Sequence, residues 1–206
     1  MKELFEKYLH ECPAVAILRG ITPAEVPEIC DLLFAAGIRL LEIPLNSPEP
    51  FQSIAVAAEH CAGRQLIGAG TVLTPEDVRE VRNAKGAFII SPNTDESVIR
   101  ETKRLGLVSI PGFFTASEGF TALKAGADFL KLFPACLGPE YVKDLKAVIK
   151  APILAVGGVN AENLPGFMKV CAGVGVGSAL YKPGKPLAQL AEDARAVAAA
   201  AKSKNR

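Results

Sequence analysis

Short apolar stretches and longer amphipathic stretches alternate along the whole chain. Eight runs rich in aliphatic and β-branched residues have the length of strands, and most of them are followed by a signal that starts a helix. The expected strands are residues 14–18, 38–43, 65–69, 87–91, 107–110, 128–133, 152–156 and 172–176. Strands that alternate with helices in this way predict a parallel β/α architecture.

Helix starts are predicted where a capping side chain is followed closely by an acidic residue. The clearest cases are Thr22-Pro-Ala-Glu25, Thr74-Pro-Glu-Asp77, Thr115-Ala-Ser-Glu118 and Asn160-Ala-Glu-Asn163, and weaker versions occur at residues 47–49 and 138–140. Three glycines, Gly37, Gly106 and Gly126, follow helical stretches as C-terminal caps do. Each strand and its helix therefore form one repeating unit.

Eight such units predict a single-domain (β/α)₈ TIM barrel over residues 1–206, preceded by a short amphipathic helix in MKELFEKYLHE. A doubly wound open sheet is the alternative, because the same alternation of elements is compatible with it. The C-terminal segment ARAVAAAAKSKNR predicts a helix that ends in a basic, irregular tail.

Composition narrows the classes of function. Half of the 206 residues are hydrophobic, 22% are charged and the net charge is +1, which argues against nucleic-acid binding and against a membrane partner. The five cysteines are scattered and the two histidines lie in helix-like segments, so a metal centre lacks ligands and none is expected. Reduced thiols indicate a cytoplasmic protein.

Polar residues and glycines follow nearly every predicted strand. In a (β/α)₈ barrel the active site lies at the C-terminal ends of the strands, so these positions are candidates for function. They are Arg19, Glu42, Gly70-Thr71, Pro92-Asn93, Pro111-Gly112, Lys131, Gly157-Gly158 and Gly177-Ser178.

Lys131 and Glu42 form the most informative pair. They belong to the sixth and second strands, which lie opposite each other in an eight-stranded barrel. Apolar neighbours and a nearby cation such as Arg19 favour a neutral amine at Lys131 that attacks a carbonyl, and Glu42 then moves protons. The alternatives are a structural ion pair of Lys131 with Glu42 or Asp128, and a capping role for Glu42. On this interpretation Phe129 and Phe133 are core residues.

Two glycine stretches indicate a phosphate site. Gly157-Gly158 and Gly177-Ser178 follow the last two strands, where many barrels bind a phosphate through backbone N–H groups. Ordinary turns are the alternative for each stretch alone. Arg19 and Thr71 are candidates for holding a substrate carboxylate, because arginine binds carboxylates through two hydrogen bonds.

These residues together resemble the 2-keto-3-deoxy-6-phosphogluconate and -phosphogalactonate aldolases, the Schiff-base aldolases of the Entner–Doudoroff and DeLey–Doudoroff routes. The resemblance covers essentially the whole chain, and the matching motifs are AILRGITP, EIPLNSP, IGAGTVL, SPN, PGFFT, LKLFPA, AVGGV and GVGSALY. It implies a homotrimeric barrel that needs no metal or cofactor. It further implies a Schiff base on Lys131, acid–base chemistry by Glu42, and pyruvate as one product.

Within that resemblance, Pro92 of SPN and Val156 of AVGGV are assigned to substrate binding, and Val156 stands where the phosphogluconate enzymes carry a threonine. EIPLNSP, SPN and AVGGV favour the phosphogalactonate branch, with the gluconate epimer as the alternative substrate. Two other functions stay open on the sequence alone. One is a phosphate-binding barrel isomerase or epimerase with Glu42 as base, and the other is a sugar-phosphate-binding protein without catalysis.

Overall fold

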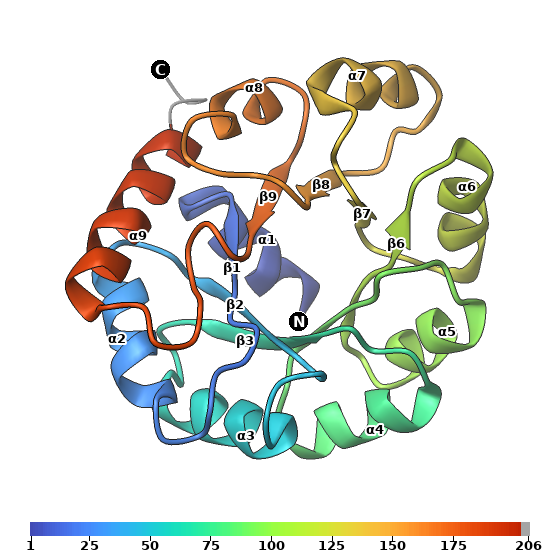
Figure 1. The fold of residues 1–206 in the computed structure, drawn as a ribbon. Helices are drawn as coiled ribbons and strands as arrows, with labels where there is room; N and C mark the ends of the chain where they lie inside the picture. The colour runs from blue at the N-terminus through green and yellow to red at the C-terminus, as the bar shows by residue number, and fades with distance from the viewer. Residues whose placement is uncertain (203–206) are drawn as a thin grey trace.

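A computed structural model describes residues 1–202, and within them parallel strands form a barrel that a ring of helices surrounds (Figure 1). The strands are β1 (Ala14–Ile17), β2 (Leu40–Pro44), β3 (Leu66–Gly70), β4 (Phe88–Ile90), β5 (Val108–Ile110), β6 (Gly112–Phe113), β7 (Leu130–Leu132), β8 (Ile153–Val156) and β9 (Gly173–Val176). The helices are α1 (Lys2–Glu11), α2 (Val26–Ala35), α3 (Pro50–His60), α4 (Pro75–Asn83), α5 (Glu96–Arg104), α6 (Ala116–Ala125), α7 (Gly138–Val148), α8 (Leu164–Met168) and α9 (Leu187–Lys202).

The fifth predicted strand, residues 107–110, corresponds to β5, and the chain continues after Pro111 as the short strand β6. Strands β5 and β6 pair with β4 and β7 respectively. Proline has no N–H for the ladder, but its carbonyl still accepts a hydrogen bond of 2.8 Å from the Lys131 N–H. The Phe129 N–H also donates to the Ser109 carbonyl, at 3.2 Å. These bonds close the sheet, so the prediction of a (β/α)₈ barrel is confirmed and the open doubly wound sheet is excluded.

Helix α1 covers the barrel at the N-terminal ends of its strands. Phe5 is fully buried and packs against Phe88 and Phe129, with ring centroids 5.3 Å and 4.9 Å apart. Phe88 and Phe129 lie where β4 and β7 begin, and they share one apolar cluster with Leu40 at the start of β2. The cavity of the barrel is therefore at the opposite end.

The predicted helix starts are correct for α4 and α6, where Thr74 with Asp77 and Thr115 with Glu118 form complete capping boxes. Gly37, Gly106 and Gly126 have positive φ angles of 94°, 72° and 106°, as the predicted caps require.

Three helix starts are predicted too early. Thr22 forms a turn with Glu25, to whose carboxylate its N–H and hydroxyl donate, and α2 begins at Val26. The hydroxyl of Ser47 accepts from the Gly20 N–H, and α3 begins at Pro50. The side chain of Asn160 accepts from the Glu162 and Asn163 N–H groups, four residues before α8 begins.

The predicted helix at the C-terminal end is α9, and the expected irregular tail falls on residues 203–206, outside the described residues. Within residues 1–202, no helix combines the length and the apolar character needed to span a membrane.

Candidate active site

A cavity of about 620 Å³ lies at the C-terminal ends of the strands. All ten residues that the sequence assigns to the site line it, from seven different strands or the loops that follow them. They are Arg19, Glu42, Thr71, Pro92, Lys131, Val156, Gly157, Gly158, Gly177 and Ser178. The closed barrel brings these positions together because parallel strands all end at the same rim.

Lys131 lies in the middle of β7 and points into this cavity. Its side chain has the same inward direction as Phe129, which packs in the barrel interior one layer below. Only 6% of Lys131 is exposed. Burial lowers the pKa of Lys131 from its ordinary value, the negative charge of Glu42 opposes this shift, and the positive charge of Arg19 adds to it. The site therefore increases the fraction of neutral amine.

Glu42 enters the cavity from β2 and is 2% exposed. Burial raises the pKa of Glu42, while the positive charges of Lys131 and Arg19 oppose that shift. Within the described chain, its buried Oε2 atom has no hydrogen-bond partner. A Cβ atom added at Gly70 would lie 1.7 Å from Oε1 of Glu42, so the carboxylate occupies the space that this glycine leaves open. Such a group is available to a ligand.

A structural ion pair does not account for Lys131. Among residues 1–202, none of the ion pairs within 4.0 Å includes Lys131 or Glu42. Asp128, the other proposed partner, accepts two hydrogen bonds from the Lys103 ammonium and one from the Ser109 N–H. The Nζ atom of Lys131 lies 4.5 Å from the centre of the Phe133 ring, which is a cation–π contact.

The loops after β8 and β9 contribute glycines to the cavity. Gly157 and Gly158 have φ angles of 98° and 75°, which residues other than glycine adopt only with strain. The Asn163 amide donates to the Gly158 carbonyl and holds this loop at the start of α8. Successive backbone N–H groups in a turn conformation form concave sites that bind anions.

Arg19 and Thr71 lie on the same side of the cavity, after β1 and β3. The guanidinium of Arg19 donates a hydrogen bond to the side-chain oxygen of Asn46, which orients it. Thr71 has a φ of 57°, and a non-glycine residue in the left-handed region is typical of sites where the backbone is constrained for function.

Several residues that line the cavity are absent from the sequence-based prediction, among them Phe133, Asn160 and Lys182. The sequence predicts Phe133 as a core residue, but 37% of it is exposed and it lines the cavity. The reason is that β7 ends at Leu132 and the residues after it lie at the rim of the barrel. The sequence predicts Asn160 only as a helix cap, and Lys182 follows directly after the motif GVGSALY. The position of Lys182 beside that motif is the one signal that points to it.

No cluster of three or more histidine, cysteine, aspartate or glutamate side chains suited to a metal ion occurs within the described part of the chain. The charged side chains that line the cavity are Arg19, Glu42, Lys131 and Lys182. They are sufficient for chemistry on an anionic carbonyl compound.

Residues 5–197 match the family model described as the KDPG and KHG aldolases. One curated relative, the 2-dehydro-3-deoxy-6-phosphogalactonate aldolase of Escherichia coli strain K12, is 45% identical over 188 residues, which are 89% of this chain and 92% of that protein.

Two solved structures extend the comparison. A structure described as native KDPGal superposes with a TM-score of 0.91 at 43% identity and covers 94% of this chain and 96% of that one. A KDPG aldolase from Legionella pneumophila, with pyruvate captured as a covalent carbinolamine intermediate, has a TM-score of 0.84 at 26% identity. That match covers 94% of this chain and 97% of the other.

Proposed function

This chain belongs to the KDPG and KHG aldolase family, and we propose that it is a Schiff-base aldolase that cleaves 2-dehydro-3-deoxy-6-phosphogalactonate reversibly into pyruvate and D-glyceraldehyde 3-phosphate. The observation that carries this proposal is the presence of buried Lys131 and buried Glu42 in one cavity, with burial shifting both toward their neutral forms. A small phosphorylated keto acid and pyruvate are its ligands.

The first half of the reaction forms the imine. Neutral Lys131 attacks the C2 carbonyl, and protonated Glu42 supplies the proton that lets the carbinolamine lose water. The resulting imine carries a positive charge and accepts electrons from the neighbouring carbon–carbon bond. Arg19, held by Asn46, binds the carboxylate beside C2 together with Thr71.

The second half breaks the C3–C4 bond. Glu42, ionised after its first proton transfer, removes the proton of the C4 hydroxyl, and the electrons of the C3–C4 bond move to the imine. The aldehyde leaves and an enamine remains on Lys131. Protonation at C3 and addition of water then release pyruvate and regenerate the amine. The imine stabilises the developing carbanion, so the residues of the chain suffice for the reaction.

Trapping of the imine tests this proposal. Sodium borohydride with pyruvate is expected to inactivate the enzyme irreversibly and to add the mass of a reduced pyruvate adduct at Lys131, found by peptide mass spectrometry. Lys131→Met prevents the adduct, whereas Lys103→Met, which removes a lysine outside the cavity, leaves it intact. An adduct at another lysine, or none in the wild type, contradicts the proposal and favours an isomerase in which Lys131 acts only through its charge.

The choice of the galactonate epimer rests on the motifs EIPLNSP, SPN and AVGGV and on the 45% identity to the phosphogalactonate aldolase of Escherichia coli. Val156 of AVGGV lines the cavity next to Gly157 and offers no hydroxyl to the substrate. Release of pyruvate from both 6-phospho epimers is the measurement, with a higher kcat/KM expected for the galactonate. A higher value for the gluconate would instead assign the chain to the alternative substrate.

We propose a homotrimer as the assembled form. The exposed apolar residues Phe120 and Leu137 lie on α6 and at the start of α7, which are neighbours in the ring of helices (Figure 1). A protein cage designed by fusing symmetric oligomeric domains contains a chain of the same fold, with a TM-score of 0.92 at 43% identity. Light scattering coupled to size exclusion is expected to give three times the chain mass of 21.7 kDa, and the monomer mass would contradict the trimer.

We also propose a cytoplasmic location. Cys12, Cys30 and Cys61 are buried free thiols, and Cys136 is an exposed one. Free thiols are typical of reducing compartments. Fractionation of the native source cells is the test, and recovery of the enzyme with secreted or periplasmic proteins would contradict this location.

A further inference from the structure

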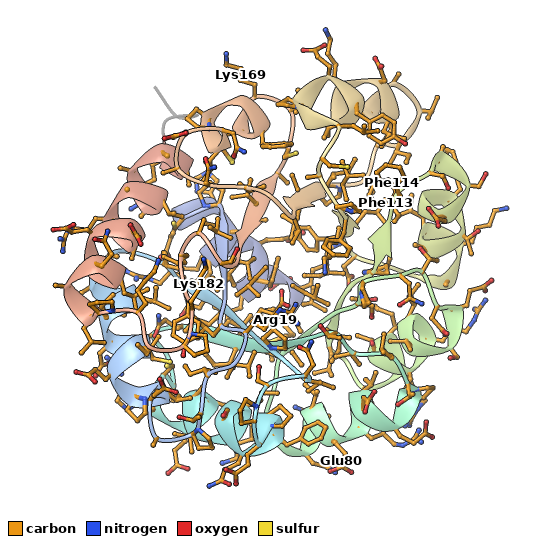
Figure 2. All side chains as sticks on the ribbon, viewed as in Figure 1. Arg19, Glu80, Phe113, Phe114, Lys169 and Lys182 are labelled. Atoms are coloured by element: carbon orange, nitrogen blue, oxygen red, sulfur yellow. The ribbon has the colours of Figure 1, made fainter. Side chains whose placement is uncertain are left out.

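Lys182 lies on the loop after β9, four residues beyond Ser178, and lines the cavity. In Figure 2, Lys182 and Arg19 are labelled inside the ring of helices, whereas Lys169 lies at its outer rim. Around the mouth of the barrel, β9 stands between β8 and β1. Lys182 is therefore in the arc between the glycine loop after β8 and Arg19 after β1.

The backbone that carries Lys182 is held from both sides. The N–H groups of Leu180 and Tyr181 both donate to the Gly177 carbonyl, and the Lys185 N–H donates to the Lys182 carbonyl at 3.1 Å. The following Pro183 packs against Gly20, where an added Cβ would lie 2.7 Å from the proline ring. The loop thus has a fixed position relative to the cavity, and the side chain of Lys182 starts from a defined point.

The ammonium of Lys182, in contrast, has no partner within residues 1–202, where no hydrogen bond or ion pair of its side chain occurs. Lys185, three residues later, is occupied: it donates to the Ala179 and Leu180 carbonyls and pairs with Asp193. An exposed lysine without a counter-ion at the mouth of a cavity attracts anionic ligands.

The anionic groups of the proposed substrate can be matched with the cations that line the cavity. The proposed substrate carries a carboxylate and a phosphate ester, the latter with a charge of about −1.5 to −2. Arg19, which donates to Asn46, is assigned to the substrate carboxylate, and Lys131 becomes the imine. The glycine loops offer partial charges only. Lys182 is the remaining cation among the described residues that line the cavity, and it shares its loop with Ser178.

We propose that Lys182 provides the formal positive charge that binds the phosphate group, and that it makes the enzyme prefer phosphorylated over unphosphorylated aldehydes and keto acids. This inference rests on the proposed aldolase function. Because the phosphate lies away from C2, Lys182 takes no part in imine formation, and its contribution is to binding and to the selection of the substrate.

The experiment compares Lys182→Met with the wild type in the direction of synthesis, with pyruvate as donor and either D-glyceraldehyde 3-phosphate or D-glyceraldehyde as acceptor. A charge-assisted hydrogen bond contributes enough that its loss is expected to raise the KM for the phosphorylated acceptor about 10- to 100-fold. The KM for glyceraldehyde and the rate of borohydride trapping with pyruvate stay within about twofold on the same argument. Lys182→Arg, which keeps the charge, is expected to retain most of the preference.

Lys169→Met is the matched control, because it removes an exposed lysine of the outer rim. Equal losses on both acceptors in Lys182→Met, or an unchanged ratio of their kcat/KM values, would overturn the role of Lys182. Thermal unfolding of each variant distinguishes a folding defect from a loss of phosphate binding, since a misfolded variant also loses pyruvate trapping. If Lys182→Met is misfolded, the acceptor preference of Lys182→Arg decides the result. Failure of trapping in the wild type would instead refute the aldolase function itself.

Discussion

At the scale of single residues, burial acts on Lys131 and Glu42 in a way that serves the proposed chemistry. Desolvation disfavours the charged form of each group, so the pKa of the lysine falls and that of the carboxyl rises. A nucleophile needs a neutral amine, and an acid–base catalyst works best when its pKa lies near the working pH. The same cavity therefore tunes both groups by one physical cause.

The dependence of activity on pH should show both shifts. Imine formation starts from protonated Glu42, so kcat/KM falls as the pH rises through the raised pKa of Glu42. Attack needs neutral Lys131, so activity increases with pH up to a pKa below the ordinary 10.5. Glu42→Gln should lower kcat about 10²- to 10⁴-fold and remove the fall that Glu42 causes.

Arg19→Met provides the control for that assignment. The positive charge of Arg19 lowers the pKa of Lys131, so its removal is expected to move the pH at which the rate of pyruvate trapping levels off to a higher value. If that pH is unchanged in Arg19→Met, the titration belongs to a group other than Lys131. Lys169→Met, far from the cavity, should leave the profile unchanged.

At the scale of the elements, local sequence determines the helices wherever a side chain caps the backbone directly. The hydroxyls of Thr74 and Thr115 accept hydrogen bonds from the Asp77 and Glu118 N–H groups, and the carboxylates of these acids accept from the threonine N–H groups. The same signal at Thr22 produces a turn instead, because Glu25 binds Thr22 before α2 starts. A capping pattern thus indicates a local bond but not the length of the helix that follows.

Thr74→Ala tests how much one such cap stabilises the barrel. We expect the free energy of unfolding to fall by about 1 kcal/mol, which for a chain of this size corresponds to about 2–4 °C in Tm. Calorimetry provides the measurement, and Thr74→Ser, which keeps the hydroxyl, should stay close to the wild type. Activity should be unaffected because Thr74 does not line the cavity. A Tm equal to that of the wild type would show that α4 needs no cap.

At the scale of the whole molecule, the two ends of the barrel have different tasks. At the end where the strands begin, Phe5 of helix α1 fills the barrel interior. At the other end, buried ionisable groups surround an open cavity. Buried unpaired polar groups cost stability, and apolar packing at the far end offsets that cost. That residues 1–206 fold as one domain stays a prediction.

Phe5→Ala tests whether the closed end of the barrel contributes to stability without contributing to catalysis. Removal of the fully buried ring is expected to lower the free energy of unfolding by about 3–5 kcal/mol, a decrease of about 10 °C in Tm. Below the transition, kcat should stay close to that of the wild type, since Phe5 lies at the end opposite the cavity. Leu4→Ala, at a half-exposed position of the same helix, serves as control and should cost much less. Equal effects of both substitutions would contradict the closing role of α1.

The sequence by itself determined the order of strands and helices and the strand ends that carry polar residues, because the alternation of apolar runs and capping signals is local. The placement of Lys131 and Glu42 on opposite walls of the barrel followed from their positions on the sixth and second strands of an eight-stranded barrel. The cavity role of Phe133, the start of α2 at Val26 and the break at Pro111 came only with the tertiary structure. So did the free ammonium of Lys182, because whether a side chain finds a partner depends on segments far away in the sequence.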